Sequence, residues 1–178
     1  MTHFRPGAPA AYSRLSIALH WLMLLLLVAV YATILLREGY PRGSDMREAL
    51  KAWHFSLGLT VFGLVWIRAA ARRFGPVRRR GGRSDRAGAL MHLALYAFMI
   101  AMPVLGWVIL SAEGDPVRLF GLPLPPLVPP NEGLAHRAEA IHETLATIGY
   151  WLVGLHAAAA LAHHYIMRDG TLRRMTVW

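Results

Sequence analysis

Histidines recur within long apolar segments of the 178-residue chain, where an ionisable side chain needs a binding partner. An imidazole is a common ligand for transition metals. One such segment, residues 140–165, carries four of them: His142, His156, His163 and His164. We therefore expect this segment to hold a metal or cofactor, with the other half of each site supplied by another part of the chain.

Spacing places these histidines on one face of a helix. His142 and His156 are 14 residues apart, so their directions differ by about 40° at about 100° per residue. The helix rise separates them by about 21 Å, which is most of the hydrocarbon core of a bilayer. Gly149 lies midway on the same stripe, and His163 continues it. One helix thus offers one ligand near each membrane surface.

Two histidines of other apolar segments lie at matching depths. His54 lies near the start of the second segment, at the depth of His142, and His20 lies about five residues into the first, at the depth of His156. The pairs His54 with His142 and His20 with His156 would each join two helices at one level. On depth alone, His163 could replace His156 in the second pair.

Two histidines that face each other across helices suit the axial ligation of a flat macrocycle. The chain has no cysteine, which excludes thiolate ligands and covalent haem attachment, so the predicted cofactor is a b-type haem at each pair. Gly58 and Gly149 would make room for the porphyrin faces. Metal ions bound as in a transporter are a weaker alternative, because zinc and copper sites gather three or four ligands at one depth. Local hydrogen bonding explains a single histidine better than four that match in depth and face.

The remaining histidines near the apolar segments have a less defined role. For His92 the simpler interpretation is a structural hydrogen bond, and a contact with a quinone or a haem propionate is the alternative. The same alternative applies to His163 and His164. All three lie toward one side of the membrane, where a lipid-soluble quinone could take a hydrogen bond and a proton.

The segments that carry these histidines are long enough to cross a bilayer, which requires about 20 apolar residues per helix. Hydrophobic residues make up 56% of the chain, more than a soluble domain of this size usually contains. We expect an all-α fold in one membrane domain, residues 1–178, formed as a four-helix up-and-down bundle with two b haems between the helices. Pro103 should kink the third helix, and the proline-rich connection after it should be irregular. The predicted spans are residues 15–36, 52–71, 87–112 and 141–167.

The charge distribution indicates topology rather than nucleic-acid binding. Of 19 basic residues, 13 lie before the first span, between the second and third, or after the fourth, and eight of these are arginines between Arg68 and Arg86. Positive charge concentrates in the cytoplasmic loops of membrane proteins. We therefore expect a multi-pass protein of the bacterial inner membrane with both termini in the cytoplasm, and with anionic lipids at the arginine-rich segment.

Several blocks resemble the bacterial cytochrome b561 family of di-haem, four-helix membrane cytochromes. The resemblance covers the chain from about Tyr12 to the C-terminus, and the helix-four block is its most specific part. The family pattern of axial haem-iron ligands falls on His20, His54, His142 and His156, which favours His156 over His163. The blocks are YSRLSIALHW, KAWHFSLG, AMPVLGW, GDPVRLFGLPLP, HETLATIGYWLVGLHAAAALAHHY and GTLRRM.

The resemblance also implies an activity. Similar members are superoxide oxidases that reduce ubiquinone, so an oxidoreductase with superoxide as periplasmic donor and ubiquinone as acceptor is expected. The alternative is a cytochrome b anchor subunit that relays electrons between quinone and a periplasmic dehydrogenase or reductase. Lys51, Arg47 and Arg137 form a candidate positive patch that would attract superoxide. Pairing of these cations with Glu48, Glu139 or haem propionates is at least as plausible a role for them.

Overall fold

The structure is a computed structural model that describes residues 13–74, 83–169 and 172–175. Part of the arginine-rich segment, Arg78 to Arg80, therefore lies outside the described residues, as does Arg5. Four helices dominate the described chain, and each is long and apolar enough to cross a membrane. They are α1 (Arg14–Arg37), α2 (Asp45–Phe74), α3 (Arg83–Glu113) and α4 (Glu132–Tyr165).

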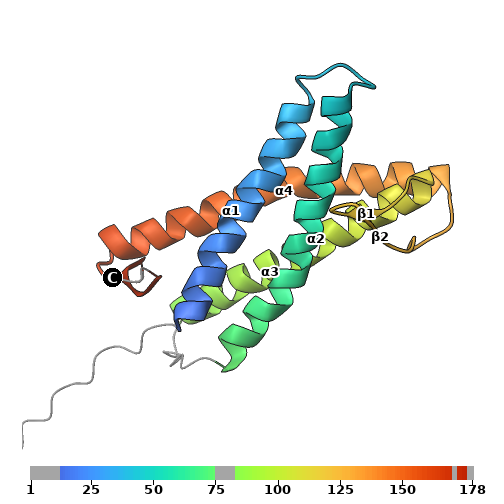
Figure 1. Ribbon diagram of the computed structural model, residues 1–178. Coiled ribbons are helices and arrows are strands. Elements are labelled where there is room, and N and C mark those ends of the chain that lie inside the picture. The colour runs from blue at the N-terminus through green and yellow to red at the C-terminus, as the bar shows by residue number, and fades with distance from the viewer. Residues whose placement is uncertain (1–12, 75–82, 170–171, 176–178) are drawn as a thin grey trace, which may run out of the picture.

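The helices form two antiparallel hairpins, α1 with α2 and α3 with α4, and the hairpins cross obliquely (Figure 1). Buried residues of three helices meet at the crossing: Met23 of α1, Val61 and Val65 of α2, and Phe98 and Met99 of α3. Most other apolar side chains face outward, as expected where lipid is the solvent. The predicted all-α membrane fold of four helices is confirmed.

Three of the helices begin with a capping side chain, and at the start of α2 the Ser44 hydroxyl accepts a hydrogen bond from the Arg47 amide. The Ser13 hydroxyl accepts a hydrogen bond from the Ser16 amide at the start of α1, and the Asn131 side-chain oxygen accepts one from the Leu134 amide at the start of α4. Such caps satisfy backbone donors that the helix itself leaves unpaired. Polar residues before the apolar run remain helical, so α4 begins at Glu132 although the predicted span starts at residue 141.

The connection between α3 and α4 is more regular than the sequence predicts. Strands β1 (Arg118–Leu119) and β2 (Leu122–Pro123) form a short antiparallel hairpin within it. Phe120 and Gly121 have φ values of 48° and 88°, and two central residues with positive φ are typical of a tight turn that matches strand twist. The sequence did not predict this turn, because Phe is rarely found at positive φ.

This hairpin is docked on the first part of α2. The Phe120 amide donates to the Ser56 hydroxyl at 3.1 Å, and the rings of Phe120 and Trp53 meet edge to face. Val117 is buried against Phe55 and Leu59 of α2. The connection therefore covers the part of α2 that carries His54. We call this side of the molecule, with connections 38–44 and 114–131, the outer side, and the opposite side the inner side.

Candidate haem-binding sites

The outer histidine pair joins α2 to α4. The ring centres of His54 and His142 lie 6.2 Å apart, with an angle of 66° between the ring planes. The Nδ1 atom of His54 lies 2.9 Å from the carbonyl oxygen of Val30 in α1. A hydrogen bond donated from Nδ1 leaves the Nε2 lone pair available, as in metal-binding histidines whose second nitrogen is held by a carbonyl.

The inner pair joins α1 to α4. The ring centres of His20 and His156 are also 6.2 Å apart, with an angle of 73° between the planes. Both pairs expected from depth are therefore adjacent in the fold. His156 is the histidine of α4 whose ring lies beside that of His20, whereas His163 is paired with Asp169.

The spacing of both pairs fits an iron ion between the two rings. Imidazole nitrogens bind a first-row transition metal at about 2.0 Å, so two rings that share one ion have centres roughly 6 Å apart. The Nδ1 atom of His142 is buried and has no hydrogen-bond partner among the described residues.

Groups of three or more histidine or acidic side chains that could hold a metal ion do not occur among the described residues. A metal site of the transporter type requires such a group, because zinc takes three or four protein ligands. The two-ligand arrangement at each level suits a macrocycle, which itself supplies the remaining ligands to its iron.

The inner pair lies beside further polar side chains. His92 of α3 has its ring centre 5.6 Å from that of His156, and its Nδ1 atom lies 3.2 Å from the Arg72 guanidinium. His20, His92, His156, Arg68 and Tyr96 line one pocket together with apolar side chains. His92 is therefore a neighbour of the candidate inner haem site, which the sequence alone did not establish.

The last histidines of α4 have different surroundings. The Nδ1 atom of His163 pairs with the Asp169 carboxylate at 2.8 Å, whereas the buried Nδ1 atom of His164 has no hydrogen-bond partner among the described residues. The indole of Trp21 donates to the carbonyl of Met175 at 2.8 Å. This bond fastens the short helix η1 (Leu172–Met175) to α1, close to His20.

Gly58 and Gly149, which were both expected to make room for a porphyrin, have different surroundings. A Cβ atom at Gly149 would fall on the Tyr31 hydroxyl and the Phe98 ring, whereas the space around Gly58 is open. The expectation that Gly149 makes room for a porphyrin face is therefore wrong, because side chains fill that space. Its place between the two ligand levels lets α4 pack closely on α1 and α3.

The candidate superoxide patch is largely compensated by acids. Lys51 lies 2.8 Å from the Asp115 carboxylate and 3.4 Å from that of Glu113, and Arg47 lies 3.7 Å from Glu38. The Arg137 Nε atom donates to the Gly133 carbonyl. The acids that pair with Lys51 and Arg47 are therefore not the expected Glu48 and Glu139. Lys51 pairs with acids at the end of α3 and in the outer connection, and Arg47 pairs with the acid that follows α1.

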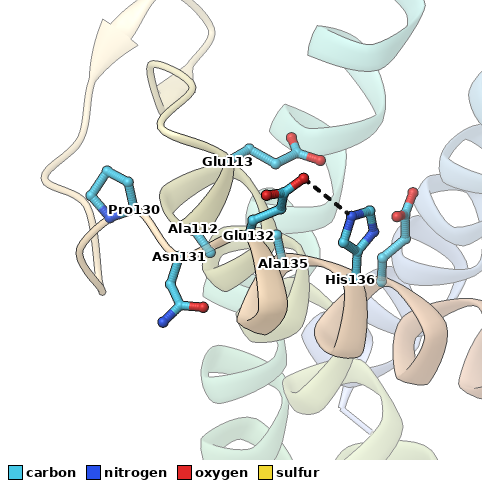
Figure 2. A pocket seen from close by; sticks show the side chains of 8 residues that line it. Ala112, Glu113, Pro130, Asn131, Glu132, Ala135 and His136 are labelled. Atoms are coloured by element: carbon cyan, nitrogen blue, oxygen red, sulfur yellow. Dashed lines mark ion pairs between the residues drawn. The ribbon is translucent and has the colours of Figure 1, made fainter.

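A pocket of about 520 Å³ opens on the outer side between the end of α3 and the start of α4 (Figure 2). Glu113, Glu132 and Glu139 line it, and His136 lies 3.9 Å from Glu132. Both of these last side chains are exposed, and neither histidine pair contributes to the lining. This acidic pocket gives the outer side less positive character than the basic residues alone suggested.

Two arginines near the pairs were not singled out as site residues from the sequence. Arg37 is the last residue of α1, the helix whose Val30 carbonyl lies 2.9 Å from His54. Arg68 lines the pocket that also contains His20 and His156. Their positions in the sequence could have indicated this, because each arginine lies at the end of a predicted span on the same side of the membrane as one histidine pair.

The fold is that of a four-helix membrane protein with two histidine pairs between its helices. The family model described as prokaryotic cytochrome b561 matches residues 11–178. The chain is 36% identical over 168 residues to "Cytochrome b561 homolog 1" of Escherichia coli (strain K12), covering 92% of this chain and 96% of the relative. It is also 36% identical to "Probable superoxide oxidase CybB" of Yersinia pestis, with 92% and 94% covered. "Cytochrome b561 homolog 2" of E. coli is 31% identical over 175 residues, 95% of this chain and 93% of the relative.

The chain belongs to the prokaryotic cytochrome b561 family. It is accordingly a bacterial inner-membrane cytochrome b that binds haem b and takes part in electron transport through the haem iron. Membership agrees with the two bis-histidine levels described above, since b-type haem takes its axial ligands from side chains without covalent attachment.

Proposed function

We propose that the protein holds two haem b groups, one between His54 and His142 and one between His20 and His156. The observation that carries this proposal is the ring-centre distance of 6.2 Å at both levels. Bound haem would supply a reversible one-electron couple at its iron. The two histidines of each pair would hold one haem, and Tyr31 and Phe98 pack beside Gly149 between the two levels.

We propose superoxide as the donor on the outer side and ubiquinone as the acceptor on the inner side. Each superoxide loses one electron and becomes dioxygen, so two are consumed for each ubiquinone that takes two electrons and two protons. The 36% identical relative named as a probable superoxide oxidase supports this choice. The basic termini support an outer side that faces the periplasm, since positive segments stay in the cytoplasm.

Candidate quinone contacts lie at the inner side. The Asp169 carboxylate lies 2.8 Å from Nδ1 of His163, so a quinone oxygen that approaches the other ring nitrogen would meet an oriented imidazole, which donates there when both nitrogens carry a proton. His164 and His92 are further candidates, and His92 is already engaged by Arg72 at 3.2 Å. Of the three, His163 has the best defined geometry for delivering a proton to reduced quinone.

The haem assignment is tested by purifying His20→Ala, His54→Ala, His142→Ala and His156→Ala variants. A pyridine haemochrome assay should give two haems per chain for the parent protein and fewer for each variant. Reduced-minus-oxidised spectra should show the same loss for both members of a pair and different losses for the two pairs. His136→Ala is the matched control, because that side chain is 73% exposed and outside both pairs. A full haem content in His54→Ala would refute the outer assignment.

The donor is tested by mixing the oxidised protein with superoxide in a stopped-flow instrument. Haem reduction should be faster than uncatalysed reduction of ubiquinone by superoxide, and it should need no other protein. Reduction at only the uncatalysed rate would reject superoxide as donor while leaving the haem assignment intact.

An anchor subunit that relays electrons between quinone and a periplasmic partner is the second candidate. Phe120, Leu122 and Leu127 of the outer connection are 55%, 67% and 48% exposed, and exposed apolar groups often mark contact surfaces. Purification in mild detergent distinguishes the candidates, because a stoichiometric periplasmic redox subunit should accompany an anchor. An active preparation of this chain alone would count against it.

A further inference from the structure

Each histidine pair has arginine on the side of the nearer membrane surface. Arg37 ends α1 on the outer side, seven residues after Val30, whose carbonyl oxygen lies 2.9 Å from Nδ1 of His54. Arg68 and Arg72 lie near the inner end of α2, and Arg68 lines one pocket with the three inner histidines His20, His92 and His156. The two sites therefore repeat one arrangement with opposite direction across the membrane.

The Arg37 guanidinium is poorly satisfied within the chain. Its Nε atom is buried and has no hydrogen-bond partner among the described residues, and the side chain is only 25% exposed. Its ion pair is with Glu38 at 3.8 Å, and the Glu38 side chain is 66% exposed. An unpaired buried donor on a charged group is costly, so this geometry suits an additional anionic acceptor on the protein side of Arg37.

The inner arginines are one helical turn apart and lie beside a pocket without acids. Arg72 lies 3.2 Å from His92, and Arg68 lines the pocket that holds His20, His156 and Tyr96. None of the residues that line this pocket is Asp or Glu. The Tyr96 hydroxyl is buried and has no hydrogen-bond partner among the described residues. Positive charge and an unused hydroxyl donor therefore converge on a space that an anion would complete.

We propose that Arg37 binds the propionate carboxylates of the outer haem, and that Arg68, Arg72 and Tyr96 bind those of the inner haem. This inference rests on the proposed function, because haem b is the ligand that brings two carboxylates to a bis-histidine site. Arg37 and Arg68 lie toward opposite membrane surfaces, so the carboxylates that they would bind belong to opposite sides of the membrane.

The test is a spectroelectrochemical titration of purified protein that carries both haems. A nearby cation favours the reduced iron, so its removal should shift the midpoint potential of that haem downward. Arg37→Gln should lower only the outer potential, whereas Arg68→Gln and Arg72→Gln should lower only the inner one. The two waves are assigned with His54→Ala and His20→Ala, each of which should retain the opposite haem.

Matched controls remove equal charge from the same ends of the molecule. Arg42 lies on the outer side and Arg73 next to Arg72, and both are exposed. Arg42→Gln and Arg73→Gln should leave both potentials at the parent values. Arg37→Lys keeps the charge, so it should restore the outer potential if Arg37→Gln folds poorly. Tyr96→Phe should lower the inner potential less than Arg68→Gln, since it removes a neutral donor.

The outcomes separate three cases. Equal shifts of both potentials, or no shift, in Arg37→Gln and Arg68→Gln would overturn the inference even if both haems are present. Unchanged potentials together with less phospholipid phosphate retained by purified Arg68→Gln would show that this arginine binds lipid headgroups instead. Absence of haem from the parent protein would refute the proposed function itself, which is a different failure from an unchanged potential.

Discussion

The hydroxyl of Tyr31 in α1 donates a hydrogen bond of 2.8 Å to the backbone carbonyl of Ala146 in α4. The bond lies between the two histidine pairs, next to Gly149, whose missing side chain leaves room for Tyr31 and Phe98. The Tyr31 ring also packs on that of Tyr150 at 4.3 Å between centres. A packed aromatic level thus separates the two candidate haem sites.

Gly149→Ala should destabilise the protein, because the new methyl group would overlap Tyr31 and Phe98. Overpacking of this kind costs about 1–3 kcal/mol. Thermal denaturation in detergent, followed by the haem spectrum, should show a lower midpoint. Gly154→Ala on the same helix is the control, since the space beside Gly154 is open. Equal midpoints for the two variants would contradict the packing described at Gly149.

Tyr31→Phe should have a smaller effect that isolates the hydrogen bond. The ring remains and keeps its contact with Tyr150, while the hydrogen bond to the Ala146 carbonyl is lost. The expected loss is about 0.5–1.5 kcal/mol. The same thermal assay measures it, with Tyr165→Phe as the control because Tyr165 is 67% exposed. A loss as large as that of Gly149→Ala would mean that the ring itself is displaced.

Ser56→Ala should loosen the outer hairpin from α2. The Phe120 amide would lose its acceptor at 3.1 Å, at a cost of about 0.5–1.5 kcal/mol. Hydrogen exchange followed by mass spectrometry should show faster exchange in a peptide that spans residues 117–124. Thr60→Ala is the comparison, because its hydroxyl bonds within α2 to the Ser56 carbonyl. Unchanged exchange in Ser56→Ala would argue against docking through this bond.

Lys51→Met should affect the outer connection more than the rate of reaction with superoxide. Lys51 is paired with Asp115 and Glu113, so its field at longer range is largely cancelled. A partly exposed ion pair contributes about 0.2–1 kcal/mol, and the expected result is faster exchange in residues 113–118. Stopped-flow reduction by superoxide should keep the parent rate. A large fall in that rate, absent in Arg42→Met, would restore Lys51 as a steering residue.

Asp169→Asn should slow ubiquinone reduction if His163 supplies a proton to the quinone. The Asp169 carboxylate orients the His163 ring at 2.8 Å, and positioned proton transfer contributes roughly 10²–10⁴-fold to a rate. Superoxide-driven haem reduction, measured without quinone, should stay unchanged. Glu143→Gln, on the outer part of α4, is the charge-matched control. A parent rate of ubiquinone reduction in Asp169→Asn would remove His163 from the proposed quinone contacts.

The sequence by itself determined the membrane helices and the two levels of histidine. Hydrocarbon thickness requires spans of a certain length, and helical periodicity puts His142 and His156 on one face whatever surrounds them. Depth was enough to name His54 and His20 as partners, and both are adjacent to the expected histidine in the fold. Axial ligation of iron by these four residues stays a proposal.

Only the tertiary structure decided which groups meet across helices. Helical periodicity gives the direction of a side chain but not its neighbour, so Asp115 as partner of Lys51 and Phe98 as neighbour of Gly149 were not predictable. The outer hairpin was missed because its turn places Phe120 at positive φ and is stabilised by Ser56, 64 residues away in sequence. The arginines beside each pair became visible as site residues for the same reason. Long-range packing, which composition and spacing do not encode locally, selects such contacts.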